Sequence, residues 1–146
     1  MPRNVSVGSG HGKYLQNITV GPHVFQADEP VDIGGNDAGP NSQELLLASL
    51  AACANITVQM YADRHQWPLK ALRSTASYSR VLTENPPDSD LKIGMVDRIE
   101  LQISFAGDLS QEQTQRLLEI AGRCPVHRML TSSVQVQTRL MEIASV

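Results

Sequence analysis

Two cysteines are the side chains of this chain best suited to chemistry. Cys53 lies in an apolar stretch, and Cys124 follows 71 residues later, directly before Pro125. A free cysteine is often an inert residue that fills space in a core. A thiolate, by contrast, is a strong nucleophile that can be oxidised reversibly. The spacing alone therefore leaves two interpretations open, a pair of structural cysteines or a thiol-based redox site.

A reactive cysteine needs a neighbour that favours its thiolate. The pKa of a free thiol is near 8.5, and a positive side chain or a helix N-terminus lowers it. Cys53 is about three turns inside the helix that we predict around it, beyond the reach of the helix dipole. A side chain must therefore activate it, and the candidates are His23, Arg123, His127 and Arg128.

Glu44 is a further candidate, nine residues before Cys53. On an ideal helix this spacing puts Glu44 on the opposite face, roughly 13 Å away along the axis. It cannot touch Cys53 within one straight helix. We therefore expect Glu44 to cap the helix, to hold an arginine, or to act across a dimer.

Metal and cofactor sites have weaker support. Cys124 and His127 have a Cys-x-x-His spacing and, with Cys53 and one of His11, His23 or His65, would suit zinc. A second close pair of ligands is missing, so we expect no metal. The glycine-rich segment 34–40 lacks the lysine and hydroxyl ending of a phosphate-binding loop. We expect a plain loop there and no cofactor.

Composition narrows the class of protein further. The chain has 146 residues and a formal net charge of −3, without a run of basic residues. These values predict one domain over residues 1–146 and no nucleic-acid partner. The apolar stretch 45–54 is too short to span a membrane, and the N-terminus does not resemble a signal peptide. We expect a cytoplasmic protein without a membrane partner and without a permanent disulfide.

The expected elements form an α+β pattern with mostly antiparallel strands. Strands are predicted at 13–20, 23–27, 69–82, 96–105 and 134–143, with loops at 30–40 and 83–90. A long helix is predicted from the Asn41 N-cap to about residue 66, and a second from Ser110 to Ala121. A short turn or helix starts at Cys124. Residues 45–54 are apolar on all sides, which indicates burial in a large core or against a partner.

The sequence around both cysteines resembles a known family. Residues 39–53, Gly-Pro-Asn-Ser-Gln-Glu-Leu-Leu-Leu-Ala-Ser-Leu-Ala-Ala-Cys, resemble the cysteine-bearing helix of the OsmC/Ohr family. This family contains osmotically inducible and organic hydroperoxide resistance proteins. Cys124-Pro125-Val126-His127 is similar to its second motif, and the likeness extends over residues 13–143. The segments 34–37 and 60–69 resemble a less characterised OsmC-like branch.

The resemblance implies a fold and an activity. It implies an intertwined homodimer in which sheets wrap around long central helices that bear the cysteines. It also implies that the Cys53 thiolate attacks an organic hydroperoxide, that Cys124 then forms a disulfide with it, and that a dithiol reductant restores both thiols. Neither metal nor flavin takes part, and oxidative stress defence is the implied role.

Two residues depart from the family pattern. The family holds its first thiolate with an arginine before the cysteine helix and a glutamate at the helix start. This chain has no arginine between Arg3 and Arg64, and Gln43 occupies the glutamate position. His23 or Lys13 is then the substitute to consider, along with the neighbouring Glu44. The alternative is a non-catalytic dimer that binds a small hydrophobic ligand or senses oxidants.

Overall fold

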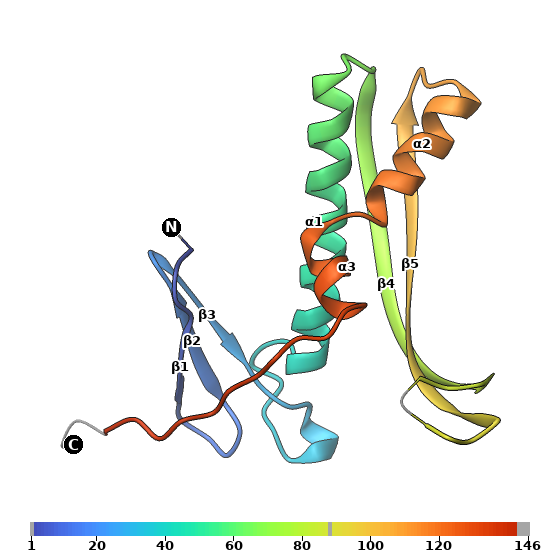
Figure 1. The fold of residues 1–146 in the computed structure, drawn as a ribbon. Helices are drawn as coiled ribbons and strands as arrows, with labels where there is room; N and C mark the ends of the chain where they lie inside the picture. Colours follow the sequence, from blue (N-terminus) through green and yellow to red (C-terminus); the bar gives the residue numbers. More distant parts are fainter. Residues whose placement is uncertain (1, 88, 143–146) are drawn as a thin grey trace. The chain divides into compact units, whose positions relative to one another are not determined.

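The computed structural model describes residues 2–87 and 89–142 and confirms an α+β fold (Figure 1). The helices are α1 (Ser42–Arg64), α2 (Gln111–Ala121) and α3 (Pro125–Leu130), with one 3-10 turn, η1 (Val31–Ile33). The strands are β1 (Ser6–Ser9), β2 (Gln16–Val20), β3 (His23–Ala27), β4 (Leu69–Glu84) and β5 (Ile93–Gly107).

The chain divides into two compact units. Unit 1 comprises residues 1–51 and 74–102, and unit 2 comprises residues 52–73 and 103–146. The N-terminal sheet belongs to unit 1. Both cysteines, α2 and α3 belong to unit 2. A single domain over residues 1–146 stays a prediction.

Unit 1 contains an antiparallel sheet in the order β1-β2-β3. The predicted strands on either side of Gly21-Pro22 are confirmed as β2 and β3, which pair from Gln16 with Ala27 to Val20 with His23. Ile18 and Ala27 are the buried residues of this sheet. Sequence analysis missed β1, because its four residues are all exposed and carry no sign of a buried face.

The loop after β3 is organised around one buried carboxylate. The Asp28 side chain accepts hydrogen bonds from the backbone N–H groups of Glu29 (2.8 Å), Asn36 (3.1 Å) and Ala38 (3.2 Å). Burial alone raises the pKa of Asp28, but the three donors outweigh this effect and lower it. Gly39 then passes against the carbonyl oxygen of Gln26, where a Cβ atom would collide. The loop thus leads the chain into α1 along a fixed path.

α1 begins with the predicted cap. The Asn41 side chain accepts a hydrogen bond from the Glu44 N–H (2.8 Å), and Glu44 accepts one from the Asn41 N–H (2.9 Å). These two bonds satisfy backbone donors that have no partner within the helix. The helix ends at Arg64, and Gln66 follows with a positive φ of 55°. Pro68 comes two residues later, so the helix cannot continue.

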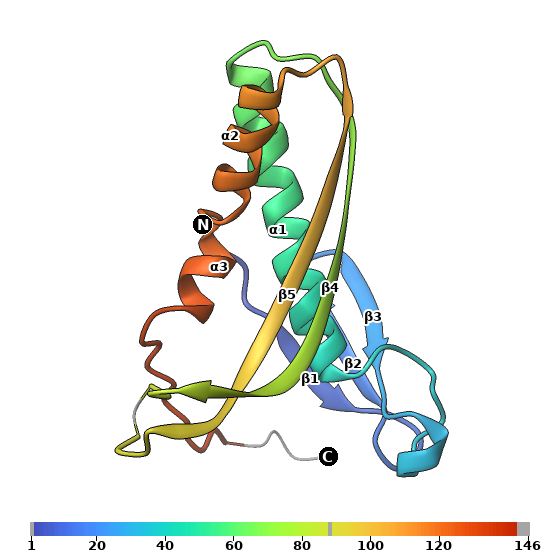
Figure 2. The ribbon, with the colours of Figure 1, turned by 90° about the vertical axis from the view of Figure 1, so that its right-hand side faces the viewer.

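The core of unit 2 lies between α1 and α2. Three buried residues of α1 have a spacing of four, which puts Ala54, Val58 and Ala62 on one side of the helix. Because Ala54 and Ala62 have small side chains, neighbouring elements can pack close to this side of α1. The other buried apolar residues of unit 2 are Leu117, Ile120, Ala121 and Cys124. Figures 1 and 2 both show α2 beside the C-terminal part of α1.

β4 and β5 are two long strands that pair as a hairpin (Figures 1 and 2). Both predicted strands are confirmed, and both are longer than predicted. β4 continues to Glu84, where a loop was expected, and Asn85 then turns with a φ of 52°. Gly107 ends β5 with a φ of 142°, against the Pro68 carbonyl. Only glycine suits that conformation and that contact.

Two expectations need correction. The strand predicted at 134–143 is wrong over 134–142, which contains neither helix nor strand, and Ile143 lies outside the described residues. Alternating apolar residues indicate a face to be covered, but a strand forms only beside another strand edge. Residues 45–54 are also not buried all round within one chain, whereas their burial against a partner, the other expectation, stays a prediction. Only Leu50 and Ala54 are buried there, and Leu46 is 42% exposed.

Candidate active site

The candidate site is a pair of free thiols in unit 2. Cys53 lies in α1, next to the buried Ala54, and its own side chain is partly exposed. Cys124 lies between α2 and α3 and is fully buried. Burial raises the pKa of the Cys124 thiol most, and the Cys53 side chain lies close enough to Cys124 to raise it as well. The fold therefore brings together two residues that are 71 positions apart in the sequence.

Cys124 is also the N-cap of α3. Its backbone is extended, with φ −68° and ψ 153°, and its Sγ atom accepts a hydrogen bond from the His127 N–H (3.3 Å). Pro125 follows at the first helical position, where its missing N–H has no consequence. The Cys-Pro pair thus has a local structural reason, because it starts a helix whose first turn faces the sulfur.

The two thiols have different surroundings. Burial raises the pKa of the Cys124 thiol, and the neighbouring Cys53 side chain raises it further. The N–H groups of His127 and Val126 oppose this shift without cancelling it. Cys124 is consequently a buried, protonated thiol near neutral pH, whereas Cys53 is a partly exposed residue. This asymmetry suits a pair in which Cys53 meets a small molecule first.

The other predicted site residues are placed as follows. Glu44 belongs to the capping box at the start of α1, and His23 is an exposed residue of β3. Both lie in unit 1. A catalytic role for either stays a prediction. Lys13, also in unit 1, lies over the ring of Tyr14, with 5.2 Å from Nζ to the ring centroid.

The basic residues near Cys124 differ in exposure. Arg123 and Arg128 are exposed, and His127 is partly buried. His127 contacts Cys124 through its backbone N–H and not through its ring. Activation of a thiolate by any of these side chains stays a prediction. Among the described residues, no group of three or more His, Cys, Asp and Glu side chains that could hold a metal ion was found.

Sequence analysis missed an aromatic cluster that joins α2 to α1. Arg116 donates a hydrogen bond from Nε to the Tyr61 hydroxyl (3.0 Å) and lies 5.4 Å from the Tyr61 ring centroid. Hydrogen bonds to Tyr61 and to Glu119 raise the pKa of Arg116 further above its usual range. His65 stacks on Tyr61 at 4.1 Å, and Trp67 meets Tyr61 edge-on at 5.5 Å. The aromatic rings of this cluster come from one short segment of the sequence, residues 61–67. Arg116, by contrast, lies 55 residues after Tyr61, so no local pattern relates the two.

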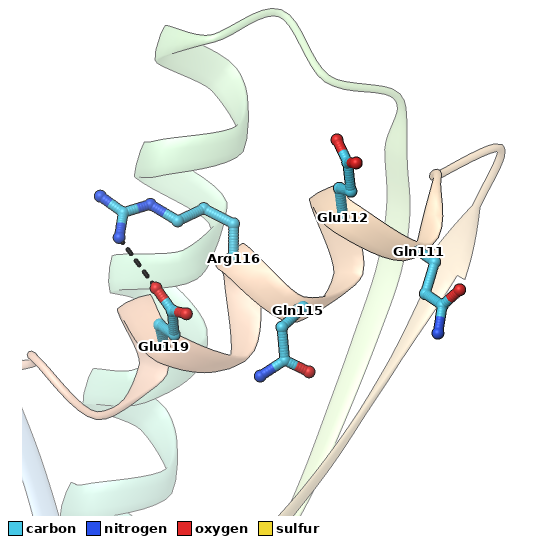
Figure 3. A pocket seen from close by; sticks show the side chains of 5 residues that line it. All are labelled: Gln111, Glu112, Gln115, Arg116 and Glu119. Atoms are coloured by element: carbon cyan, nitrogen blue, oxygen red, sulfur yellow. Dashed lines mark hydrogen bonds and ion pairs between the residues drawn. The ribbon is translucent and has the colours of Figure 1, made fainter.

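An open depression on α2 lies apart from both cysteines. Figure 3 shows that Arg116 pairs with Glu119 across it (3.0 Å). It is lined by residues with polar or charged ends, namely Gln111, Glu112, Gln115, Arg116 and Glu119, and by neither cysteine.

α1 has the length and apolar composition of a membrane-spanning helix, over Ser42–Arg64. The core helix of a soluble protein passes the same test, so this property alone does not indicate a membrane protein. The sequence-based expectation about membrane spans rested only on the apolar stretch 45–54, although the helix predicted over residues 41–66 already had this length.

Comparisons with known proteins give a consistent result. A family model described as "OsmC-like protein" matches residues 34–139. No curated protein gives a sequence match. An OsmC-like protein from Mycoplasma pneumoniae has a similar structure, with a TM-score of 0.69 and 20% identity over 89% of this chain and 87% of that one.

Two further similar structures are organic hydroperoxide resistance proteins. The protein OhrB of Bacillus subtilis has a TM-score of 0.56 and 21% identity over 94% of this chain and 96% of its own. A Vibrio cholerae protein, described as a putative member of that group with captopril bound in one active site, has a TM-score of 0.58 and 18% identity. That match covers 92% of this chain and 88% of the Vibrio chain. At these identities the likeness establishes the fold alone.

Proposed function

Because this chain belongs to the OsmC-like protein family, we propose that it is a cysteine-dependent peroxidase that reduces organic hydroperoxides in oxidative stress defence. The observation that carries this proposal is the pair of free thiols, one partly exposed and one buried beside it. Similar structures that are described as organic hydroperoxide resistance proteins support the choice of substrate class.

The proposed cycle uses two side chains and an external reductant. The Cys53 thiolate attacks the hydroperoxide, the O–O bond breaks, an alcohol leaves, and Cys53 becomes a sulfenic acid. The Cys124 sulfur attacks this sulfenic sulfur and displaces water, which carries away the Cys124 proton. A dithiol reductant then returns two electrons and two protons by thiol–disulfide exchange. In sum, one hydroperoxide and one dithiol give one alcohol, one water molecule and one external disulfide.

The different surroundings of the two cysteines favour these roles. Cys53 is the more exposed residue of the two, and the first step requires a hydroperoxide to reach its sulfur. The thiol of Cys124 stays protonated and buried, so it is shielded from direct oxidation but close enough to react with an oxidised Cys53. The reverse assignment would require the hydroperoxide to reach a fully buried sulfur.

The test is to add one equivalent of cumene hydroperoxide to the reduced protein and to measure free thiols and intact mass. We expect the loss of two thiols and of about two mass units, which is the signature of one disulfide. Cys53→Ser should consume no hydroperoxide. Cys124→Ser should stop at a sulfenic acid, about 16 mass units heavier, and should stall when dithiothreitol is supplied as the reductant.

Two outcomes would contradict the proposal. If both thiols survive in the wild-type protein, Cys53 is not a peroxide-reactive residue. If Cys124→Ser turns over with dithiothreitol at the wild-type rate, Cys124 does not resolve the intermediate.

We further propose that the working form is a cytoplasmic homodimer. Ile56 and Met60 follow Cys53 at spacings of three and seven, which puts them on the same face of α1. They are 55% and 60% exposed, so apolar surface beside the candidate site lies uncovered in one chain. A second copy that covers this face would also exclude water from Cys53.

Sedimentation analysis tests the dimer. We expect the wild-type protein to sediment as a dimer and Ile56→Glu to sediment as a monomer, because the new carboxylate would be buried at the interface. Gln115→Glu adds the same charge at an exposed position of α2 and should remain dimeric. A dimeric Ile56→Glu protein would exclude this face of α1 as the interface.

A second candidate function has one observation in its favour. Within the described part of unit 2, no arginine, lysine or histidine side chain forms a hydrogen bond with Cys53. A protein that binds a small hydrophobic ligand, or that senses oxidants without turnover, needs no such activating group. Stoichiometric oxidation of Cys53 without turnover in the same assay would favour the sensor.

A further inference from the structure

α3 joins the core of unit 2 at its N-cap residue, Cys124. α3 has six residues, Pro125–Leu130, and none of them is buried. A helix this short is unstable without help from its surroundings. Its N-cap residue, Cys124, is by contrast fully buried. The helix is therefore anchored to the core of unit 2 at its N-cap, directly before its first residue.

The sulfur of this residue carries the hydrogen bond of the cap. Cys124 Sγ accepts from the His127 N–H at 3.3 Å. Serine, threonine, aspartate or asparagine usually fills this position through a side-chain oxygen. Here the cap is a group that can be oxidised.

The capping sulfur is also the neighbour of Cys53. A disulfide requires the two sulfurs to come within about 2.05 Å with a fixed torsion angle. This is much shorter than a hydrogen-bond contact between thiols, so Sγ must turn toward Cys53 and away from the start of α3. We infer that formation of the Cys53–Cys124 disulfide removes the N-cap of α3, so that the redox state of the pair determines whether residues 125–131 are helical.

The inference rests on the disulfide of the proposed function. Two thiols lose two electrons and two protons, and an organic hydroperoxide takes them up as its O–O bond breaks to alcohol and water. A dithiol reverses the change. The segment that unwinds contains the exposed Met129 and Leu130, so the oxidised protein presents a different apolar surface to its reductant.

Nuclear magnetic resonance of the labelled full-length protein tests this inference. Helical Cα shifts of residues 126–130 are compared in the reduced protein and after oxidation with diamide, which forms disulfides without a hydroperoxide. An N-cap changes helix stability by roughly five-fold in the equilibrium constant. We expect the helical shifts of 126–130 to collapse in the disulfide form, while those of 112–120 in α2 persist.

Two variants separate capping from oxidation. Cys124→Ser keeps an oxygen at the N-cap and should stay helical over 126–130 with or without diamide. Cys124→Ala should lose these helical shifts even when reduced. Full helical shifts in reduced Cys124→Ala would overturn the inference.

The inference and the proposed function can fail separately. Unchanged α3 shifts in a protein whose Cys53–Cys124 disulfide is confirmed by mass would overturn the inference, as would failure of diamide to form that disulfide. A disulfide that forms with diamide and uncaps α3, but never forms with cumene hydroperoxide, would support the inference and contradict the peroxidase proposal.

Discussion

Leu117→Ala should destabilise the protein strongly, because Leu117 is fully buried in the core of unit 2. Burying a leucine side chain contributes roughly 1.5–3 kcal/mol, and the cavity left by truncation adds a further cost. The expected loss is about 3 kcal/mol in the free energy of unfolding. With a urea m-value of about 2 kcal/mol per molar, the unfolding midpoint should fall by about 1.5 M.

The adjacent residue supplies a matched control. Leu118 is 47% exposed, so Leu118→Ala removes the same atoms but leaves no closed cavity. Its expected cost is about 1 kcal/mol or less. Both variants and the wild-type protein are unfolded in urea at one protein concentration and followed by far-UV circular dichroism, because dimer stability depends on concentration.

Comparable losses for the two variants would refute this reasoning. They would show that Leu118 is covered as completely as Leu117 in the working protein. Burial in the single chain would then be a poor guide to the energetics of α2.

Two further predictions concern the loop that precedes α1. Gly39→Ala should lower the melting temperature by about 5 °C or more, because its Cβ would collide with the Gln26 carbonyl, whereas Gly8→Ala, with open space around it, should be close to neutral in a thermal melt. Asp28→Asn should destabilise the protein at pH 7, because burial alone raises the pKa of Asp28 but three N–H donors lower it overall. The carboxylate therefore stabilises the fold above the unfolded pKa of about 3.9, and this contribution is lost as pH falls through the lower folded value. Urea unfolding from pH 7 to pH 3 should show the difference from wild type shrinking at low pH, and a constant difference would contradict the assignment. Asp32→Asn, at an exposed residue of η1, serves as the control.

Local signals in the sequence predicted most of the fold. The caps at Asn41 and Ser110 are where they were expected, because each is formed by residues only three positions apart. The strand at 134–143 was wrong over its described part for the opposite reason. Its alternating apolar residues indicate a covered face, but they do not identify the strand edge that would cover it.

The candidate site was only partly predictable. Both cysteines were selected from their residue type, and their proximity could be inferred only from the family resemblance. Nothing local relates Cys53 to Cys124, because their contact depends on how α2 packs against α1. The Arg116–Tyr61 hydrogen bond that joins these helices is equally non-local, and no sequence signal pointed to it.

The chain contains a single tryptophan, and it belongs to the aromatic cluster at the end of α1. Trp67 lies edge-on to Tyr61 and 5.4 Å from His65. Its fluorescence emission therefore reports on its surroundings at the junction of α1 and α2. Selective excitation of this tryptophan follows unit 2, the unit that holds both cysteines, without an added dye.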